Sequence, residues 1–371
     1  MANATYIWED ENWPNFHWNG DALLTLHGNV RAKQGRLYQA LATLGFDERL
    51  RAQADVLISE TVNTALIEGD RLDLASVRSS VARRLGLESH GVNKEDRHAE
   101  GLVDVLHDAV ANLEQPLERS RLDGWHAALF PTGYSGLKRI RIANFRDDAK
   151  GPMQVVSQRR GREVVHYEAP PATRVAKEMN AFLEWFNSPP KSLDPLLRVG
   201  LAHFWFVSIH PYEDGNGRLA RAIGDRALSQ CENNEQRFFS LSHQIQSNKK
   251  AYYDVLEKTQ KGTGDLTGWL WWFLNTMEAA LDAAMQQTSN AVWWGRLWQR
   301  HKNFAFNARH RKALGKLSDG PHEPVTPRLW RKLAGGSIET AQRDIRALEK
   351  AGIVRREGQG RGTKYYLVMD D

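Results

Sequence analysis

Cysteine is almost absent from the 371-residue chain, which contains only Cys231. One cysteine excludes an internal disulfide and a zinc site built from several thiolates, and such sparing use is typical of a reducing compartment. Long apolar runs are also missing, because the most apolar stretches, 201–209 and 266–277, are shorter than the roughly 20 residues that cross a bilayer. The first residues show no signal peptide pattern. We therefore expect a cytoplasmic protein with no membrane partner.

The composition is that of a globular protein. With 41% hydrophobic and 26% charged residues, a chain of this length suits two or three domains with their own cores. The formal net charge of +5 is mildly basic, which by itself excludes neither nucleic acid nor phosphate ligands.

Apolar residues recur at helical spacing along most of the chain. The pattern predicts helices over much of 20–87 and 103–129, and again over 175–186 and 195–209. Between them, two short β-type runs within 153–167 flank a polar, glycine-containing loop, which predicts one β-hairpin. The fold class is therefore mainly α.

A short segment after the helix at 195–209 has the residues of an anion site. Gly215, Asn216 and Gly217 form a turn in which no bulky side chain keeps an anion from the backbone N–H groups. The residues that follow have helical composition, so the turn lies at a helix N-terminus, which favours phosphate. Arg218 and Arg221 are three residues apart and share one helix face, where both guanidinium groups can bind one phosphate chain.

Two further side chains complete this segment. Asp214 provides a hard oxygen ligand just before the turn, suited to Mg²⁺ held against phosphates. His210 lies at the end of an apolar helix, where a neutral imidazole can take a proton from a hydroxyl near neutral pH. A base, a metal ligand, a phosphate turn and two arginines thus occur within twelve residues.

The twelve residues, HPYEDGNGRLAR, resemble the signature of the Fic family, H-P-F-x-D/E-G-N-G-R-x-x-R, with Tyr212 in place of phenylalanine. With its flanks, the resemblance covers roughly 100–262. It implies transfer of AMP from ATP to Tyr, Thr or Ser hydroxyls of protein substrates, with self-modification expected. It also implies His210 as the general base, Asp214 as the Mg²⁺ ligand, and nucleotide contacts at Gly215, Asn216, Gly217, Arg218, Leu219, Ala220, Arg221 and Asn248.

Two other segments resemble parts of the same family. The hairpin at 153–167 is similar to the family's flap, where a target segment pairs with a strand edge and its hydroxyl is aligned. The segment from Thr64 to Gly69, TALIEG, resembles the inhibitory motif S/T-x-x-x-E-G/N. By this resemblance Glu68 would pair with Arg221 and displace the outer phosphates of ATP, which predicts a restrained enzyme.

The C-terminal segment has a different composition. Residues 325–371 carry ten Lys/Arg and six Asp/Glu, a difference of 10 − 6 = +4. Two short helices followed by two alternating runs resemble a winged helix. Thr340, Arg343 and Arg346 would then reach DNA, with Arg361 in the wing tip. A protein-binding or dimerising winged helix is an equal alternative.

We accordingly expect a Fic-type helical core with a β-hairpin flap, plus a C-terminal winged helix-turn-helix domain. The expected segments are an inhibitory helical domain (1–95), the catalytic core (96–262), connecting helices (263–310) and the winged helix (311–371). Three alternatives to AMP transfer stay open: removal of AMP, transfer of another nucleotide or phosphate moiety, and a DNA-binding regulator with a Fic-like nucleotide sensor. A homodimer also stays open.

Overall fold

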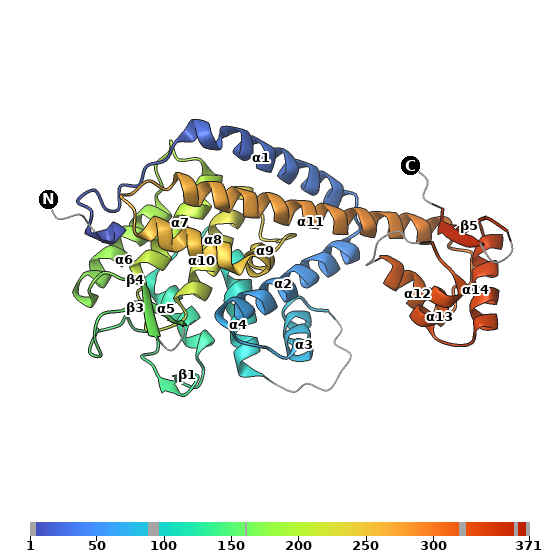
Figure 1. The fold of residues 1–371 in the computed structure, drawn as a ribbon, viewed down its shortest axis with the longest axis horizontal. Coiled ribbons are helices and arrows are strands. Elements are labelled where there is room, and N and C mark those ends of the chain that lie inside the picture. Colours follow the sequence, from blue (N-terminus) through green and yellow to red (C-terminus); the bar gives the residue numbers. More distant parts are fainter. Residues whose placement is uncertain (1–4, 88–95, 160–161, 319–323, 360–362, 369–371) are drawn as a thin grey trace. The chain divides into compact units, whose positions relative to one another are not determined.

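The computed structural model describes residues 5–87, 96–159, 162–318, 324–359 and 363–368. Within them the protein is mainly helical, as predicted (Figure 1). Its contacts divide it into two compact units, Met1–Gln39 with Gly45–Ala284, and Ala40–Leu44 with Met285–Asp371. Arg361 and most of the polar segment at 91–97 lie outside the described residues. Our four-segment division stays a prediction.

The larger unit contains most of the helices and four short strands (Figure 1). They are η1 (Ile7–Glu9), α1 (Gly20–Ala42), α2 (Phe46–Glu68), α3 (Leu74–Arg84), α4 (Arg97–Val110), α5 (Arg119–Leu129), β1 (Tyr134–Ser135), β2 (Lys138–Arg139), β3 (Gln154–Arg159), β4 (Arg162–Glu168), α6 (Ala172–Asn187), α7 (Pro195–Ile209), α8 (Asn216–Glu232), α9 (Leu241–Ser247) and α10 (Lys249–Gln260). Helix α11 (Thr267–Arg300) begins in this unit.

Helix α7 forms the centre of this unit and packs along α8. Asp194 caps it by accepting hydrogen bonds from the N–H groups of Leu196 and Leu197. Pro195 fills the first helical position, which suits a residue without an N–H. From Leu196 to its end the helix is buried on every side, which explains its continuous apolar sequence. The predicted helix at 195–209 is confirmed.

Helix α2 packs against α8 and α9 and brings its C-terminal end to the start of α8. It ends because Gly69 adopts a left-handed conformation (φ 92°), and the Gly69 N–H bonds back to the last turn. The stop leaves Glu68 as the final helical residue.

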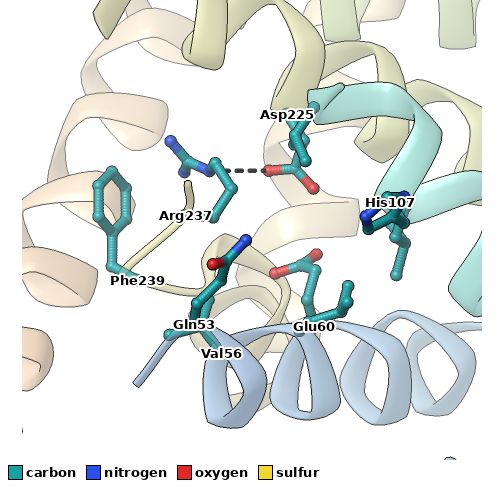
Figure 2. A pocket seen from close by; sticks show the side chains of 10 residues that line it. Gln53, Val56, Glu60, His107, Asp225, Arg237 and Phe239 are labelled. Atoms are coloured by element: carbon teal, nitrogen blue, oxygen red, sulfur yellow. Dashed lines mark ion pairs between the residues drawn. The ribbon is translucent and has the colours of Figure 1, made fainter. Parts of the chain in front are cut away.

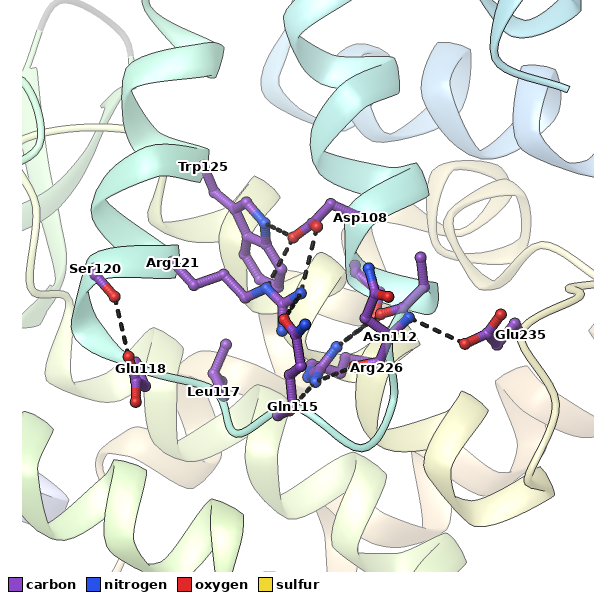
Figure 3. Close-up of polar contacts among 12 residues, drawn as sticks. Asp108, Asn112, Gln115, Leu117, Glu118, Ser120, Arg121, Trp125, Arg226 and Glu235 are labelled. Carbon is purple, nitrogen blue, oxygen red and sulfur yellow. Dashed lines mark hydrogen bonds and ion pairs between the residues drawn. The ribbon is translucent and has the colours of Figure 1, made fainter.

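Arg226 of α8 anchors the loop between α4 and α5 (Figure 3). Its fully buried guanidinium donates to the carbonyl oxygens of Ala109, Ala111, Asn112 and Gln115. Burial lowers the pKa of Arg226 to about 10, so it stays charged at neutral pH. Beside it, Asp108 accepts from both Arg121 and Trp125 of α5. These contacts fix α5 relative to α8.

Strands β3 and β4 form the predicted hairpin and pair antiparallel. Val155 pairs with Tyr167 and Val156 with Val165, so His166 has no residue opposite it. The hairpin therefore contains a β-bulge at His166, which redirects that side chain. Tyr167 holds the base of the hairpin to α7, since its buried hydroxyl donates to the Ser208 carbonyl at 2.7 Å.

The smaller unit has its own core around Trp330, Ile345, Leu348 and Ile353. Its elements are α12 (Ala308–Ser318), α13 (Pro327–Ala334), α14 (Ile338–Lys350), β5 (Val354–Glu357) and the antiparallel β6 (Lys364–Leu367). Asp344 of α14 is buried and accepts two hydrogen bonds from Arg309 of α12 at 2.8 and 2.9 Å. The two predicted helices and two strands are present, while their identity as a winged helix stays a proposal.

Among the described residues, no helix combines the length and apolarity that crossing a membrane requires.

Candidate active site

The segment from His210 to Arg221 joins the end of α7 to the start of α8. His210 ends α7 in a left-handed conformation (φ 51°), and Gly215 precedes α8 with φ 81°. A Cβ at Gly215 would lie 2.8 Å from the Phe130 ring, so both backbone and space require glycine there. The buried Asn216 side chain locks the turn, because its amide both accepts from the Tyr212 N–H and donates to the Tyr212 carbonyl.

The His210 imidazole is partly buried and oriented by one hydrogen bond. Its Nδ1 lies 3.1 Å from the carbonyl oxygen of Val207. A carbonyl only accepts, so Nδ1 carries the proton. Burial lowers the pKa of His210, which favours the neutral ring. In that tautomer Nε2 keeps its lone pair, which is the state a general base requires.

The first turn of α8 provides an anion site. Its opening N–H groups have no partner within the helix, because the ladder starts with the Leu219 N–H bonding to the Gly215 carbonyl at 3.0 Å. Two buried guanidinium nitrogens nearby, Arg218 Nε and Arg221 Nη1, also lack hydrogen bonds among the described residues. Free N–H groups at a helix start and guanidinium groups beside them are the donors that bind phosphate in proteins.

A carboxylate of α2 already occupies this turn. Glu68 Oε1 lies 2.7 Å from Arg221 Nη2, and a Cβ at Gly217 would be only 2.3 Å from the same oxygen. The Arg221 side chain is almost completely buried, whereas that of Glu68 is 29% exposed. Burial alone would lower the pKa of Arg221, but the neighbouring Glu68 charge raises it. Glu68 therefore occupies the place of an anion over Gly217.

Thr64 makes two further contacts with the same arginine. Its hydroxyl oxygen accepts from Arg221 Nε at 2.5 Å, and its carbonyl oxygen accepts from Arg221 Nη2 at 3.1 Å. The first and fifth residues of the TALIEG motif, Thr64 and Glu68, thus hold one guanidinium. Arg218 is held differently, since it pairs with Asp70 at 3.2 Å and lies 4.8 Å above the Phe130 ring.

Three groups fix Asp214, and two of them, Ser135 and His126, were not indicated by the sequence. The Ser135 hydroxyl donates to Asp214 Oδ2, and the Gly215 N–H donates to Oδ1. His126 Nδ1 accepts from the Ala143 N–H, so its Nε2–H donates to the Asp214 carbonyl at 3.2 Å. Burial lowers the pKa of His126 to about 4, which keeps this ring neutral. The Asp214 side chain itself is 43% exposed and accessible to a ligand.

Arg146 is another residue that the sequence gave no reason to select. Its buried guanidinium donates to the His210 carbonyl at 2.8 Å and also to the Pro170 carbonyl after the flap. It thereby connects the turn at His210–Arg221, called the catalytic turn below for its proposed role, to the base of the hairpin. The local sequence at 141–148 shows no motif that would single out Arg146.

The remaining predicted site residues lie in varied surroundings. Leu219 and Ala220 are fully buried, main chain included, so neither presents surface to a nucleotide in this structure. Asn248 is exposed between α9 and α10, as an adenine-side residue requires. Tyr252 is buried against His203, and the Tyr253 hydroxyl donates to the Ile67 carbonyl of α2 at 3.4 Å. These nucleotide contacts stay predictions.

Two buried acids, Glu60 of α2 and Asp225 of α8, line one pocket of the larger unit (Figure 2). Glu60 of α2 accepts from Ser240 and Ser242, and Asp225 of α8 lies 3.9 Å from Arg237. Both acids line a cavity of about 30 Å³, large enough for a water molecule or two. Burial, together with the Glu60 charge, holds the pKa of Asp225 well above its usual range.

Comparisons with known proteins agree with this site. Residues 116–228 match the Fic/DOC family, and residues 6–87 match a domain of unknown function (DUF4172). The segment that matches the Fic/DOC family includes the turn at His210–Arg221.

Curated relatives include two proteins that are named protein adenylyltransferase Fic. That of Nematostella vectensis is 25% identical over 64% of this chain, and that of Drosophila willistoni is 29% identical over 48%. The chain spans 51% and 33% of their lengths. A Fic family structure from Desulfovibrio desulfuricans has a TM-score of 0.55 at 19% identity, covering 96% of this chain and 98% of its own. It shows that the fold is of the Fic type.

Proposed function

We propose that this protein transfers AMP from ATP to hydroxyl groups of proteins, including its own chain. The observation that carries the proposal is the arrangement at the start of α8. There a carboxylate already sits where the N–H groups and Arg221 would bind a phosphate. The Fic/DOC domain and the names of the curated relatives support the same activity.

The proposed reaction uses groups within this turn. The acceptor hydroxyl oxygen attacks the α-phosphorus of ATP, and the bond between that phosphorus and the β-phosphate oxygen breaks. Pyrophosphate leaves, and the hydroxyl proton passes to Nε2 of His210, whose Nδ1–H stays bonded to Val207. The N–H groups of α8 with Arg218 and Arg221 bind the leaving phosphates and stabilise their charge.

Asp214 fits the Mg²⁺ that such chemistry requires. Mg²⁺ is commonly held by one or two carboxylates together with substrate phosphates and water. Among the described residues no three His, Cys, Asp or Glu side chains are grouped so that they could hold a metal ion, so an ion at Asp214 would take its other ligands from ATP and water. Asp214 is exposed beside the anion site and its orientation is set by Ser135 and Gly215. When bound, the ion would neutralise phosphate charge.

We also propose that Glu68 restrains the activity. While Glu68 and Thr64 hold Arg221, the outer phosphates of ATP lose their buried cation. Coupling between such an inhibitory contact and ligand binding is typically about 1–3 kcal/mol, which slows transfer without abolishing it.

The decisive test incubates the purified protein with Mg²⁺ and ATP labelled at either the α- or the γ-phosphate. Covalent α-label on protein, together with released pyrophosphate, is the expected result. Covalent γ-label would contradict AMP transfer and indicate phosphate transfer. Incubation with a protein already carrying AMP tests the reverse activity, and loss of its AMP without any α-label transfer would favour removal.

A second function, DNA binding, is supported by the smaller unit. Arg343 and Arg346 are exposed on α14 one turn apart, whereas Asp344, the acid between them, is buried against Arg309. We propose a winged helix whose α14 contacts duplex DNA.

Binding to mixed-sequence duplex DNA across salt concentrations tests this proposal. Replacing Arg343 and Arg346 with alanine should reduce the slope of log affinity against log salt by about two. An unchanged slope, or no binding together with reversible dimer formation in sedimentation, would contradict DNA contact through α14.

A further inference from the structure

A chain of hydrogen bonds connects the flap hairpin to helix α10, and no step above uses it. Ser157 Oγ of β3 lies 2.6 Å from His166 Nε2 of β4. His166 Nδ1 lies 2.7 Å from Glu257 Oε2 of α10, and Lys261 Nζ donates to the other Glu257 oxygen at 2.6 Å. Two strands and one helix are thus connected through a single imidazole.

The β-bulge explains why this imidazole reaches α10. His166 is the extra residue of β4, opposite no residue of β3. Bulges break the strict alternation of side chains and commonly redirect one of them near functional sites. In a regular strand, His166 would pair with a residue of β3 like its neighbours. The bulge frees it from this pairing, and we infer that this lets its side chain contact Glu257.

The protonation states make the contact directional. Burial raises the pKa of Glu257, but hydrogen bonds from Lys261 and His166 lower it overall, so this carboxylate only accepts. Nδ1 of His166 therefore donates to Glu257. In the neutral ring, Nε2 accepts a hydrogen bond from the Ser157 hydroxyl. In the imidazolium, both ring nitrogens donate hydrogen bonds.

The order Ser–His–Glu is also that of a nucleophile with its base, but the surroundings favour a structural role. Ser157 is exposed, and the side chains of His166 and Glu257 are 32% and 33% exposed. Nucleophilic serine chemistry depends on a water-excluded site with donors aimed at the developing oxyanion. Water reaches these three partly exposed side chains, so we interpret their hydrogen bonds as contacts that fix the hairpin relative to α10.

Helix α10, which Glu257 belongs to, lies next to two parts of the proposed site. It follows Asn248, and its Tyr253 donates to Ile67 beside Glu68. The flap is thereby connected through α10 to the nucleotide side and to the inhibitory end of α2.

We propose that His166 is a positioning residue, which holds the flap to α10 so that an acceptor segment paired with the flap is aligned with the α-phosphate. The proposal rests on the proposed function, because it assumes that the flap receives the acceptor. A misalignment of about 1 Å between reacting groups can cost on the order of a hundredfold in rate. Losing the contact of His166 with Glu257, while the contact with Ser157 remains, should lower the rate of transfer by less, about fivefold to tenfold.

Two substitutions separate the two nitrogens of this ring. His166→Gln places an amide near Nε2, keeping the contact with Ser157 and losing that with Glu257. His166→Asn places an amide near Nδ1, keeping Glu257 and losing Ser157. Asp254→Asn is the matched control, since Asp254 lies on the same helix in an exposed ion pair with Lys250.

The experiment measures three quantities in the Glu68→Gly background: covalent AMP on the chain, the KM for ATP, and hydrogen exchange of the amides at 154–168. His166→Gln should reduce AMP labelling about fivefold to tenfold with an unchanged KM for ATP, and should accelerate exchange in the flap. His166→Asn should retain most of the labelling, and Asp254→Asn should match the parent.

Parental labelling and exchange in His166→Gln would overturn the proposal, as would an equal loss in His166→Asn. If the Glu68→Gly parent itself shows no covalent AMP, the proposed function fails. The exchange measurement would then still decide whether the Glu257 contact holds the flap.

Discussion

The catalytic turn and the flap hairpin both serve the proposed reaction, but they are built in different ways. In the turn, the proposed reactive residues lie within twelve positions and the backbone is locked by a local contact of Asn216 with Tyr212, although other elements also reach it. The flap is placed by contacts between distant residues, such as His166 with Glu257, which are 91 positions apart. The chemistry is therefore local in the sequence, whereas alignment of the acceptor depends on tertiary structure. Substitutions in the two regions should differ in size and in kind.

The largest effect is expected from His210→Ala. Removing the only group proposed to take the hydroxyl proton should lower AMP transfer about 10²–10⁴-fold, while ATP still binds. Transfer is measured with α-labelled ATP and binding by calorimetry. The exposed His243 provides the control, because His243→Ala should leave both unchanged. Normal transfer by His210→Ala would refute the assignment of the base.

Ser135→Ala should have a smaller effect that appears in the metal dependence. Without the Ser135 hydroxyl, Asp214 loses a donor that orients its carboxylate, and such outer contacts typically change metal affinity about tenfold or more. The Mg²⁺ concentration for half-maximal transfer should rise, and Mn²⁺ binding in the presence of ATP should weaken, as spin resonance would show. Ser120→Ala, which removes an exposed hydroxyl on α5, should change neither. Equal Mn²⁺ binding in both variants would exclude this role for Ser135.

Asp225→Asn should have the smallest effect, on stability rather than on chemistry. Because the folded protein holds the pKa of Asp225 above its unfolded value, it binds more protons than the unfolded chain between those values. The free energy of unfolding must then fall as pH rises through the folded pKa, by about 1.4 kcal/mol per unit of pKa difference.

Urea unfolding at about pH 5 and about pH 8 measures this dependence. The asparagine variant should lose part of it, because its amide does not titrate. The control Asp254→Asn, at an exposed position, should keep the dependence of the natural protein. Parallel pH profiles for Asp225→Asn and the natural protein would contradict a buried acid with a raised pKa.

The same contrast explains what the sequence could predict. The apolar pattern indicated α7 at about 195–209, and the structure shows that its start is fixed locally by the Asp194 cap and Pro195. The motif likewise indicated the base, the turn and the arginines. The bulge at His166 could not be predicted, since it depends on the register between β3 and β4.

Support from outside the motif was also invisible in the sequence. Ser135, His126 and Arg146 contact the catalytic turn from other elements, and each is an ordinary residue in its own local sequence. Asn216 shows the opposite case. It lies within the motif, and in the structure both of its side-chain amide groups bind Tyr212 and lock the turn, while its expected nucleotide contact stays a prediction.

The central claim is that Glu68 occupies the anion site and restrains transfer. Glu68→Gly removes the carboxylate that holds Arg221 and opens the space over Gly217. The direct measurement is the intact mass of this variant after incubation with ATP and Mg²⁺, beside the natural protein and the double variant with His210→Ala. We expect AMP adducts to accumulate about tenfold faster or more than in the natural protein, and to be absent from the double variant. Equal adduct formation with and without Glu68 would contradict the restraint.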